Sequence, residues 1–536
     1  MWPEFVFEID DVKYPDMLNC ATELLDRHVE EGRGGHRAVG MLIEGKPVFA
    51  TYAQLQAQAN RLANVMSGTL GLVPGSRVLL RSANHPMFAA LWLGAMKAGL
   101  VVVPTMPLLR ARELKKVIDK GNVAIAICDE ALSSELNQCM NPAEPTYAKS
   151  LKRVVRFNSD DRLDGLEAMM AAAPVTYTNV TTRADDVCML AFTSGTTGEP
   201  KAAAHFHRDV LAMCDTFSKH VLKPDAHDIF CGTPPIAFTF GLGGQLCFPL
   251  RVGASVLLVE RLTPELLIDA IQKSSATISF TAPTFYRQMG LLLKARGSTP
   301  GASLLPSLKK SVSAGEALPD ATRQLWKDAT GIEMIDGIGS TEMMHIFISS
   351  AGANVRKGAI GKVVPGYRAM VVDANMRPVG PGTIGRLAVK GPTGCRYVDD
   401  PRQASYVKDG WNLPGDAFTV DADGYYFYQA RTDDMIVSAG YNIAGPEVES
   451  ILMTHDAVAD CGVVGVPDDE RGQIVKAFVI LRAEAKPGDA LIKALQDFVK
   501  ERIAPYKYPR AIEFCTELPR TETGKLQRFR LRAKDA

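Results

Sequence analysis

The chain has 536 residues, which is too long for one ordinary domain and predicts roughly two to four folding units. Hydrophobic residues make up 46% of it and charged residues 22%, as in a globular protein with a large core. Lysines plus arginines equal aspartates plus glutamates at 60 each, which excludes a strong overall field for nucleic acid or an anionic membrane, so small-molecule partners are expected.

The spacing of the cysteines and the composition of the N-terminal residues indicate which cellular compartment to expect. The ten cysteines are scattered without a Cys-x-x-Cys pair, which argues against a zinc site or a disulfide framework and favours a reducing compartment. The first ten residues lack the basic start of a secretory signal. Lys97, Pro104 and Pro107 interrupt the apolar run from Phe88 to Leu109, so this run predicts a helix and a strand instead of a membrane span. We therefore expect a cytoplasmic protein.

Helical and strand periodicities alternate through the first 315 residues. Predicted helices span residues 51–71, 86–98, 111–120, 208–220 and 264–274, and Thr51 is a candidate N-cap of the first. Predicted strands span residues 77–81, 100–104, 123–128, 255–259, 277–281 and 310–313. Strands separated by helices in this way predict a parallel sheet that is covered on both faces.

The pattern changes twice in the last third of the chain. From about Gly358, short segments with frequent glycine and proline predict a small antiparallel or barrel-like β region. Beyond Asp433, helices over 446–454 and 489–502 alternate with strands over 460–466 and 476–481, which predicts a compact α+β unit. The predicted class is α/β, with a large N-terminal domain of αβ-layered sheets plus the β-barrel-like region (1–432) and a small mobile α+β C-terminal domain (433–536).

The first chemical motif is the loop Thr193-Ser-Gly-Thr-Thr-Gly-Glu-Pro-Lys201, which follows the apolar run Val187–Phe192. Its hydroxyls, glycine N–H groups and lysine can surround the oxygens of a polyphosphate. It does not fit the Walker pattern, and a polar surface turn is the alternative interpretation. The candidate phosphate-binding residues are Thr193, Ser194, Gly195, Thr196, Thr197, Gly198 and Lys201.

Four later stretches follow this loop in a fixed order: Asp336-Gly-Ile-Gly-Ser-Thr-Glu342, Gly415-Asp416, Arg431-Thr-Asp-Asp434 and Pro519-Arg-Thr-Glu-Thr-Gly-Lys525. Together the five stretches resemble the motifs of the adenylate-forming superfamily, which comprises acyl-CoA synthetases, adenylation domains and luciferases. The resemblance implies a large N-terminal domain, a small C-terminal domain that rotates about a hinge at Asp433, and two half-reactions in one site.

The resemblance also implies an ATP site. Activating a carboxylate with ATP depends mainly on alignment and charge neutralisation while pyrophosphate leaves. Glu342 is expected to bind Mg²⁺, Asp416 and Arg431 to bind ribose, and Lys525 to act in catalysis together with Thr341. The other expected nucleotide contacts are Gly315, Glu316, Asp336, Gly337, Ile338 and Ser340.

Alternatives and departures accompany this interpretation. Glu342 and Asp416 could be carboxylates at a turn or helix start, and Lys525 could be a solvated lysine. Ile338 stands where the family often has a tyrosine that stacks on adenine, which predicts weaker or different stacking. Pro414 replaces a threonine that is usual before Gly415.

In the implied second half-reaction, a thiol attacks the acyl-adenylate without a covalent enzyme intermediate, so no cysteine nucleophile is required. The resemblance places the pantetheine arm of CoA beside Ser438–Asn442, which includes Gly440 and Tyr441. Arg471 and Lys476 are candidates for the CoA phosphates, or are solvated surface charges.

The segments Pro235–Gly244 and Met343–Phe347 resemble the benzoate-CoA ligase branch, which includes 2-aminobenzoate-CoA ligases. Phe238 and Phe240 would be flat walls for a ring, and Thr239 and His345 polar contacts for a substituent. The predicted acid-binding residues are Phe238, Thr239, Phe240, Gly339, His345 and Ile346.

We therefore expect an ATP- and Mg²⁺-dependent aryl-carboxylate:CoA ligase for benzoate or 2-aminobenzoate. The alternatives are a medium-chain or alicyclic acid as substrate, a carrier protein as acceptor, and an acyl-adenylate sensor without catalysis. The expected partners are the acid, ATP and CoA, with no nucleic acid and no membrane, and a homodimer is left open.

Overall fold

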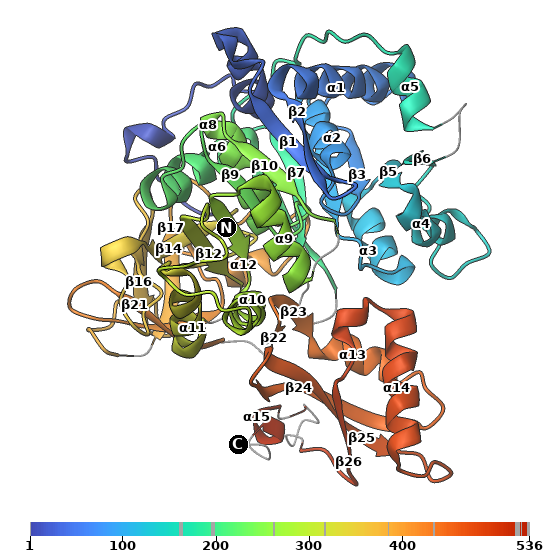
Figure 1. The fold of residues 1–536 in the computed structure, drawn as a ribbon. Coiled ribbons are helices and arrows are strands. Elements are labelled where there is room, and N and C mark those ends of the chain that lie inside the picture. The colour runs from blue at the N-terminus through green and yellow to red at the C-terminus, as the bar shows by residue number, and fades with distance from the viewer. Residues whose placement is uncertain are drawn as a thin grey trace.

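The computed structural model describes residues 2–159, 165–193, 199–260, 263–315, 318–383, 385–431, 435–519, 526 and 528–532 (Figure 1). The first sheet has six strands in the order β6-β5-β3-β4-β7-β8. Its strands are β3 (Arg77–Arg81), β4 (Val101–Thr105), β5 (Ile125–Asp129), β6 (Arg153–Phe157), β7 (Val187–Thr193) and β8 (Lys201–Phe206). All neighbours pair in parallel except β7 and β8, which confirms the predicted parallel sheet and adds an antiparallel edge.

The second sheet has nine strands in the order β15-β14-β13-β12-β11-β9-β10-β1-β2. They are β1 (Arg37–Ile43), β2 (Lys46–Thr51), β9 (Ile229–Gly232), β10 (Ser255–Leu258), β11 (Ile278–Thr281), β12 (Lys310–Ala314), β13 (Ile335–Gly339), β14 (Ile346–Ser350) and β15 (Lys362–Val363). The middle strands are parallel, and antiparallel pairs form both edges. The β1–β2 hairpin was not predicted from the sequence.

Helices pack against both sheets, and their ends follow local signals in the sequence. Thr51 caps α1 (Tyr52–Asn64) in a capping box with Gln54, as predicted for the cap. The predicted helix over 51–71 continues as a π-helical turn, and that over 208–220 is likewise divided. The other helices of this part are α2 (Pro86–Lys97), α3 (Ala111–Gly121), α4 (Ser133–Met140), α5 (Leu166–Ala172), α6 (His207–Met213), α7 (Thr239–Leu242), α8 (Phe248–Val252), α9 (Pro264–Ser274), α10 (Pro283–Ala295) and α11 (Asp320–Thr330).

Short 3₁₀ and π-helical turns connect these elements. They are η1 (Asp10–Val12), η2 (Thr22–Asp26), η3 (Val29–Arg33), η4 (Val65–Thr69), η5 (Glu130–Leu132), η6 (Cys214–Leu222), η7 (Gly243–Cys247), η8 (Gly352–Asn354) and η9 (Pro505–Lys507).

A third, antiparallel sheet follows, as the glycine- and proline-rich texture predicted. It contains β16 (Arg368–Val372), β17 (Gly385–Lys390), β18 (Val407–Lys408), β19 (Trp411–Asn412), β20 (Asp416–Val420) and β21 (Tyr426–Arg431), with α12 (Gln403–Tyr406) before β18.

The C-terminal part is a small α+β unit with a hydrophobic core of its own, which confirms the predicted fold class (Figure 1). Its elements are β22 (Met435–Ser438), β23 (Tyr441–Ala444), α13 (Gly445–Leu452), β24 (Val458–Asp468), β25 (Gly472–Leu481), α14 (Asp489–Arg502), β26 (Ala511–Phe514) and α15 (Arg528–Arg532). The domain boundary after residue 432 stays a prediction, because residues 432–434 lie outside the described ranges. Within those ranges, no helix has both the length and the apolar character needed to cross a membrane.

Candidate active site

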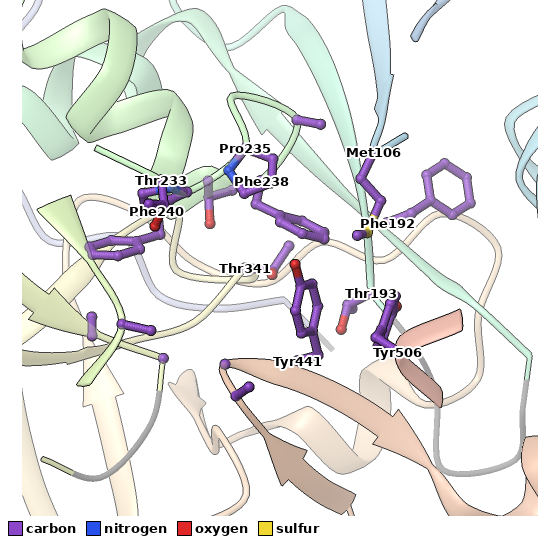
Figure 2. Close-up of a pocket in the computed structure, with 18 of the residues that line it drawn as sticks. Met106, Phe192, Thr193, Thr233, Pro235, Phe238, Phe240, Thr341, Tyr441 and Tyr506 are labelled. Carbon is purple, nitrogen blue, oxygen red and sulfur yellow. The ribbon is translucent and has the colours of Figure 1, made fainter. Parts of the chain in front are cut away.

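A cavity of about 540 Å³ lies at the carboxyl ends of strands from both large sheets. This edge is where ligands generally bind in parallel α/β sheets. Residues that end or follow β4, β7, β9, β11, β12 and β13 line it, and the C-terminal unit adds a further wall. Among the lining residues, Figure 2 labels Met106, Phe192, Thr193, Thr233, Pro235, Phe238, Phe240, Thr341, Tyr441 and Tyr506.

Thr193 and Lys201 stand opposite each other at the base of the predicted phosphate loop. Thr193 ends β7 and Lys201 begins β8, and the two are partners in the antiparallel register. The loop between them therefore connects the two strands of a β-hairpin. Outside the described residues lie the other predicted phosphate contacts, Ser194, Gly195, Thr196, Thr197 and Gly198.

Glu342 lies beside this hairpin, on the connection between β13 and β14. Its carboxylate is buried, with Lys201 Nζ 3.6 Å from Oε1, and it accepts a hydrogen bond from the Tyr397 hydroxyl. Burial and the neighbouring Glu342 charge raise the pKa of Tyr397, so this hydroxyl stays a donor. Lys201 also packs over the Tyr397 ring, with 5.0 Å from Nζ to the ring centroid. The structure thus gives Lys201 a position beside the predicted metal ligand.

The surroundings of Glu342 fit Mg²⁺ as the family uses it. Within the part of the chain that the structure describes, no three His, Cys, Asp or Glu side chains gather as a ready metal cage. Mg²⁺ is usually held by one or two carboxylates together with substrate phosphates and water. Glu342 would supply the carboxylate: it is buried, its neighbour Thr341 lines the cavity, and its oxygens here contact Lys201 and the hydroxyls of Tyr397 and Tyr406.

The predicted nucleotide segment forms β13 and pairs closely with β14. Gly339 is the register partner of Ile346, and a Cβ atom on Gly339 would lie 2.4 Å from the carbonyl oxygen of His345. Gly337 is similarly close to the Ile346 side chain, at 2.7 Å. Ile338, between the two glycines, is half-buried. The glycines therefore allow the β14 backbone to approach, while adenine stacking at Ile338 stays a prediction.

Asp336 begins this nucleotide segment and is 3% exposed. Its Oδ1 atom makes no hydrogen bond within the described structure. Burial raises the pKa of Asp336 to about 7, and the positive charge of Arg323 opposes that rise. A buried carboxyl group with an unsatisfied oxygen lowers the stability of the fold. Carboxyl groups with a raised pKa are common at binding sites.

The fold brings the two predicted ribose residues together. Asp416 begins β20, Arg431 ends β21, and the two are partners in the antiparallel register. The Asp416 side chain is buried, and Gly415 before it has a φ of 88°, which glycine adopts without strain. The side chain of Arg431 lies outside the description, as do Glu316, the predicted hinge Asp433 and the predicted catalytic Lys525.

The residues predicted to bind the acid gather at one end of the cavity. Phe238, Thr239 and Phe240, at the start of α7, line it together with His345. The Phe240 ring centroid is 5.6 Å from that of His345. Two further phenylalanines, Phe217 and Phe248, surround the imidazole, with centroid distances of 5.4 and 4.6 Å. This end of the cavity is therefore aromatic and apolar.

His345 is a neutral polar group in these apolar surroundings. It is 3% exposed, and neither ring nitrogen makes a hydrogen bond of good geometry within the described structure, although the nearby Phe240 backbone partly offsets the effect of burial on its pKa. Burial lowers the pKa of His345 to about 3, so the imidazole carries no charge near neutral pH. A neutral imidazole that lines a cavity can donate one hydrogen bond and accept another.

The C-terminal unit reaches the cavity through Gly440 and Tyr441. A Cβ atom on Gly315 would lie 3.8 Å from the Cα atom of Gly440, so these two predicted cofactor residues are neighbours. Figure 2 shows the Tyr441 side chain extending from the C-terminal unit toward Thr341 and Phe238. Its ring stacks on that of Tyr506 at 4.2 Å between centroids.

Ser340 and the two proposed CoA-phosphate contacts complete the set of predicted residues. The hydroxyls of Ser340 and Tyr406 are hydrogen-bonded at 3.0 Å, and Ser340 lines the cavity. Arg471 lines it too, and its Nε donates to Ser438 at 3.3 Å. Lys476 is absent from the cavity wall within the described structure and forms a 2.7 Å ion pair with Glu513.

Sequence reasoning missed the tyrosines that complete the site. Tyr397 and Tyr406 reach Glu342 from the connection between β17 and β18, and Tyr506 stacks under Tyr441 from η9. No spacing pattern marks these residues, because their roles arise from contacts between distant parts of the chain. A search for aromatic residues near the motifs would have required the fold.

Comparison with known proteins supports the interpretation of this site. The model of the AMP-binding enzyme family matches residues 25–396, and that of the AMP-binding enzyme C-terminal domain matches residues 447–525. The chain belongs to the AMP-binding enzyme family. The predicted superfamily and its enzyme class, an AMP-forming acid–thiol ligase, are therefore confirmed.

Individual members of the AMP-binding enzyme family match nearly the whole chain. It is 34% identical over 526 residues to the benzoate–CoA ligase of Thauera aromatica, with 97% of each chain covered. It is 31% identical over 521 residues to the 3-hydroxybenzoate–CoA ligase of Aromatoleum sp. (strain CIB), with 96% of each covered. The crystal structure of the anthranilate CoA ligase AuaEII in complex with anthranoyl-AMP matches with a TM-score of 0.74 at 32% identity, covering 98% of this chain and 99% of that one.

Proposed function

We propose that this protein is an ATP- and Mg²⁺-dependent aryl-carboxylate:CoA ligase, with benzoate or 2-aminobenzoate as the acid. The observation that supports this most directly is the aromatic end of the cavity, where Phe238, Phe240 and His345 lie in the same cavity as Thr341 and Tyr441. Flat aromatic walls favour a planar ring over a flexible alkyl chain. The benzoate-, 3-hydroxybenzoate- and anthranilate-CoA ligases among the relatives agree with this choice.

In the first half-reaction, a carboxylate oxygen of the acid attacks the α-phosphorus of ATP and pyrophosphate leaves. Thr193 and Lys201, at the base of the phosphate loop, would hold the leaving phosphates together with the loop itself. Glu342 would hold Mg²⁺, an ion that neutralises charge on phosphate oxygens. Asp416 would accept hydrogen bonds from the ribose, and Lys525 would approach the carboxylate and α-phosphate oxygens.

In the second half-reaction, the thiol sulfur of CoA attacks the carbonyl carbon of the aroyl-adenylate, the bond to AMP breaks, and the thiol proton leaves to solvent or a base. Gly440 and Tyr441 would line the path of the pantetheine arm. The chain would change from one half-reaction to the other by rotation of residues 433–536 about Asp433.

Recognition of a ring substituent would fall to Thr239 and His345. The neutral imidazole can bond to an amino or hydroxyl group without bringing a charge into the apolar end of the cavity. A ring without such a substituent would gain no hydrogen bond from the imidazole, so the substituted acid would be favoured.

The proposal is tested by measuring AMP release with CoA and a panel of acids: benzoate, 2-aminobenzoate, 3-hydroxybenzoate, cyclohexanecarboxylate and octanoate. We expect the aryl acids to have the highest kcat/KM. Preference for octanoate or cyclohexanecarboxylate would overturn the aryl assignment, and turnover only with a carrier protein would overturn CoA as acceptor. Absence of acid-dependent pyrophosphate exchange into ATP with every acid would instead favour a sensor.

A further inference from the structure

A buried ion cluster joins the C-terminal unit to helix α3. Lys507 Nζ in η9 donates hydrogen bonds to both carboxylate oxygens of Glu447, each at 3.0 Å, and to Glu113 of α3. The exposed fractions of these residues are 4%, 9% and 6%. The backbone N–H of Ala504 donates to Glu113 as well, at 3.1 Å. Glu113 therefore receives two hydrogen bonds from a unit almost 400 residues away in sequence, the Lys507 contact spanning 394 positions.

Each part of this cluster has a second partner on its own side of the interface. Glu113 also accepts from the backbone N–H of Arg110 at 2.9 Å, which caps its own helix. Lys507 retains Glu447, which belongs to the C-terminal unit itself. Breaking a buried ion pair is usually costly because it leaves one charge uncompensated. On separation Lys507 would keep the Glu447 carboxylate and Glu113 would keep the Arg110 N–H as a hydrogen-bond donor, which lowers the cost of opening the contact.

The cluster is itself part of the cavity wall, since Glu113, Glu447 and Lys507 are among the residues that line the cavity. Tyr506, next to Lys507 in the chain, stacks on Tyr441 with an angle of 25° between the rings. Tyr441 in turn projects toward Thr341 and Phe238 (Figure 2). When Lys507 is fixed on Glu113, the stacked tyrosines are therefore fixed in the cavity.

We propose that the Lys507–Glu113 contact is a reversible interdomain latch that positions Tyr506 and Tyr441 for the thioester-forming half-reaction. The inference rests on the proposed function, because a latch that serves one half-reaction presupposes an enzyme with two half-reactions. Both residues line the cavity, and in this account Glu113 and Lys507 are positioning residues that act through the stacked tyrosines.

The test compares two half-reactions in the full-length enzyme. Glu113→Gln removes the charge but keeps an oxygen that can cap Arg110. We expect formation of aroyl-CoA from supplied aroyl-adenylate and CoA to fall roughly tenfold, and acid-dependent pyrophosphate exchange into ATP to stay within about twofold of wild type. Equal losses in both half-reactions, or no loss in either, would overturn the latch.

A matched control and a function-independent measurement separate the possible failures. Glu135 also accepts from α3, at Ala111 N–H and Arg110, but makes no contact with the C-terminal unit among its described hydrogen bonds, so Glu135→Gln should leave both half-reactions unchanged. Hydrogen exchange at residues 441–444 and 504–508 should accelerate in Glu113→Gln and not in Glu135→Gln. Unchanged hydrogen exchange at residues 441–444 and 504–508 in Glu113→Gln would overturn the latch. A wild-type enzyme that does not exchange pyrophosphate into ATP would overturn the proposed function alone.

Discussion

At the scale of single residues, Asp336 combines a role in the predicted nucleotide site with a cost to the fold. Its pKa is raised from 3.8 to about 7, so the folded protein binds the proton more tightly than the unfolded chain does. The cost is therefore absent below about pH 4, grows as the pH rises, and is complete above about pH 7. It is on the order of 4 kcal/mol at most, since one pKa unit corresponds to about 1.4 kcal/mol.

We predict that Asp336→Asn raises Tm relative to wild type at pH 8 and raises it less at pH 4. The reason is that asparagine does not ionise, so the variant carries no cost of burying a charge at pH 8. Loss of the carboxylate should also weaken nucleotide binding. Calorimetry over this pH range and a titration with ATP measure the two effects. A change in Tm of the same size at both pH values would contradict the assignment of the cost to ionisation.

The second prediction at this scale concerns His345. Its replacement by leucine should lower kcat/KM for 2-aminobenzoate about fivefold to tenfold, the effect of about one net hydrogen bond, and should change the value for benzoate less. Because the pKa of His345 is about 3, the ratio between the two acids should stay constant from pH 6 to 9 in the wild-type enzyme. A ratio that changes across this range would indicate that the imidazole titrates there.

At the scale of elements, sequence patterns predicted the bounds of those helices and strands whose ends are marked by local signals. Helices α9 and α14 and strand β3 begin and end where they were expected, because proline, caps and apolar periodicity mark their bounds. Motif spacing placed Asp416 and Arg431 in one site, and the β20–β21 register pairs them. The contact of Tyr397 with Glu342 could not be predicted in this way, because it depends on how the third sheet packs against the β13–β14 connection.

The close β13–β14 pair leads to a prediction for its two glycines. Gly339→Ala should be the more damaging change, because its Cβ atom would meet the backbone of His345, whereas that of Gly337→Ala would meet side-chain atoms of Ile346. We expect a loss of stability of about 3 kcal/mol for the first and about 1 kcal/mol for the second. Denaturant unfolding measures both, and Gly380→Ala, which would meet nothing within 4 Å, is the control. The reverse order would show that β14 can move away.

At the scale of the whole molecule, the two proposed half-reactions call on different segments of the C-terminal unit. Gly440 and Tyr441, the predicted pantetheine contacts, line the cavity, and Lys525, the proposed catalytic residue of the adenylation step, belongs to the same C-terminal unit. In the proposed mechanism, residues 433–536 rotate between the two steps so that each segment can reach the cavity in turn. The family resemblance supplied a proposed hinge residue, Asp433, but the sequence could not supply the contact between the two parts, since Glu113 and Lys507 meet only in the fold.

We predict that Asp433→Pro, which restricts φ at the proposed hinge, separates the half-reactions. If the variant is held in the arrangement described here, thioester formation from supplied aroyl-adenylate should continue near the wild-type rate, while pyrophosphate exchange should fall by about 100-fold, since misplacing a catalytic group commonly costs that much. Asp433→Ala removes the same carboxylate but allows rotation, so it should retain both activities. Loss of both activities in Asp433→Ala would mean that the carboxylate itself matters, and two unaffected half-reactions in Asp433→Pro would place the rotation elsewhere in the chain.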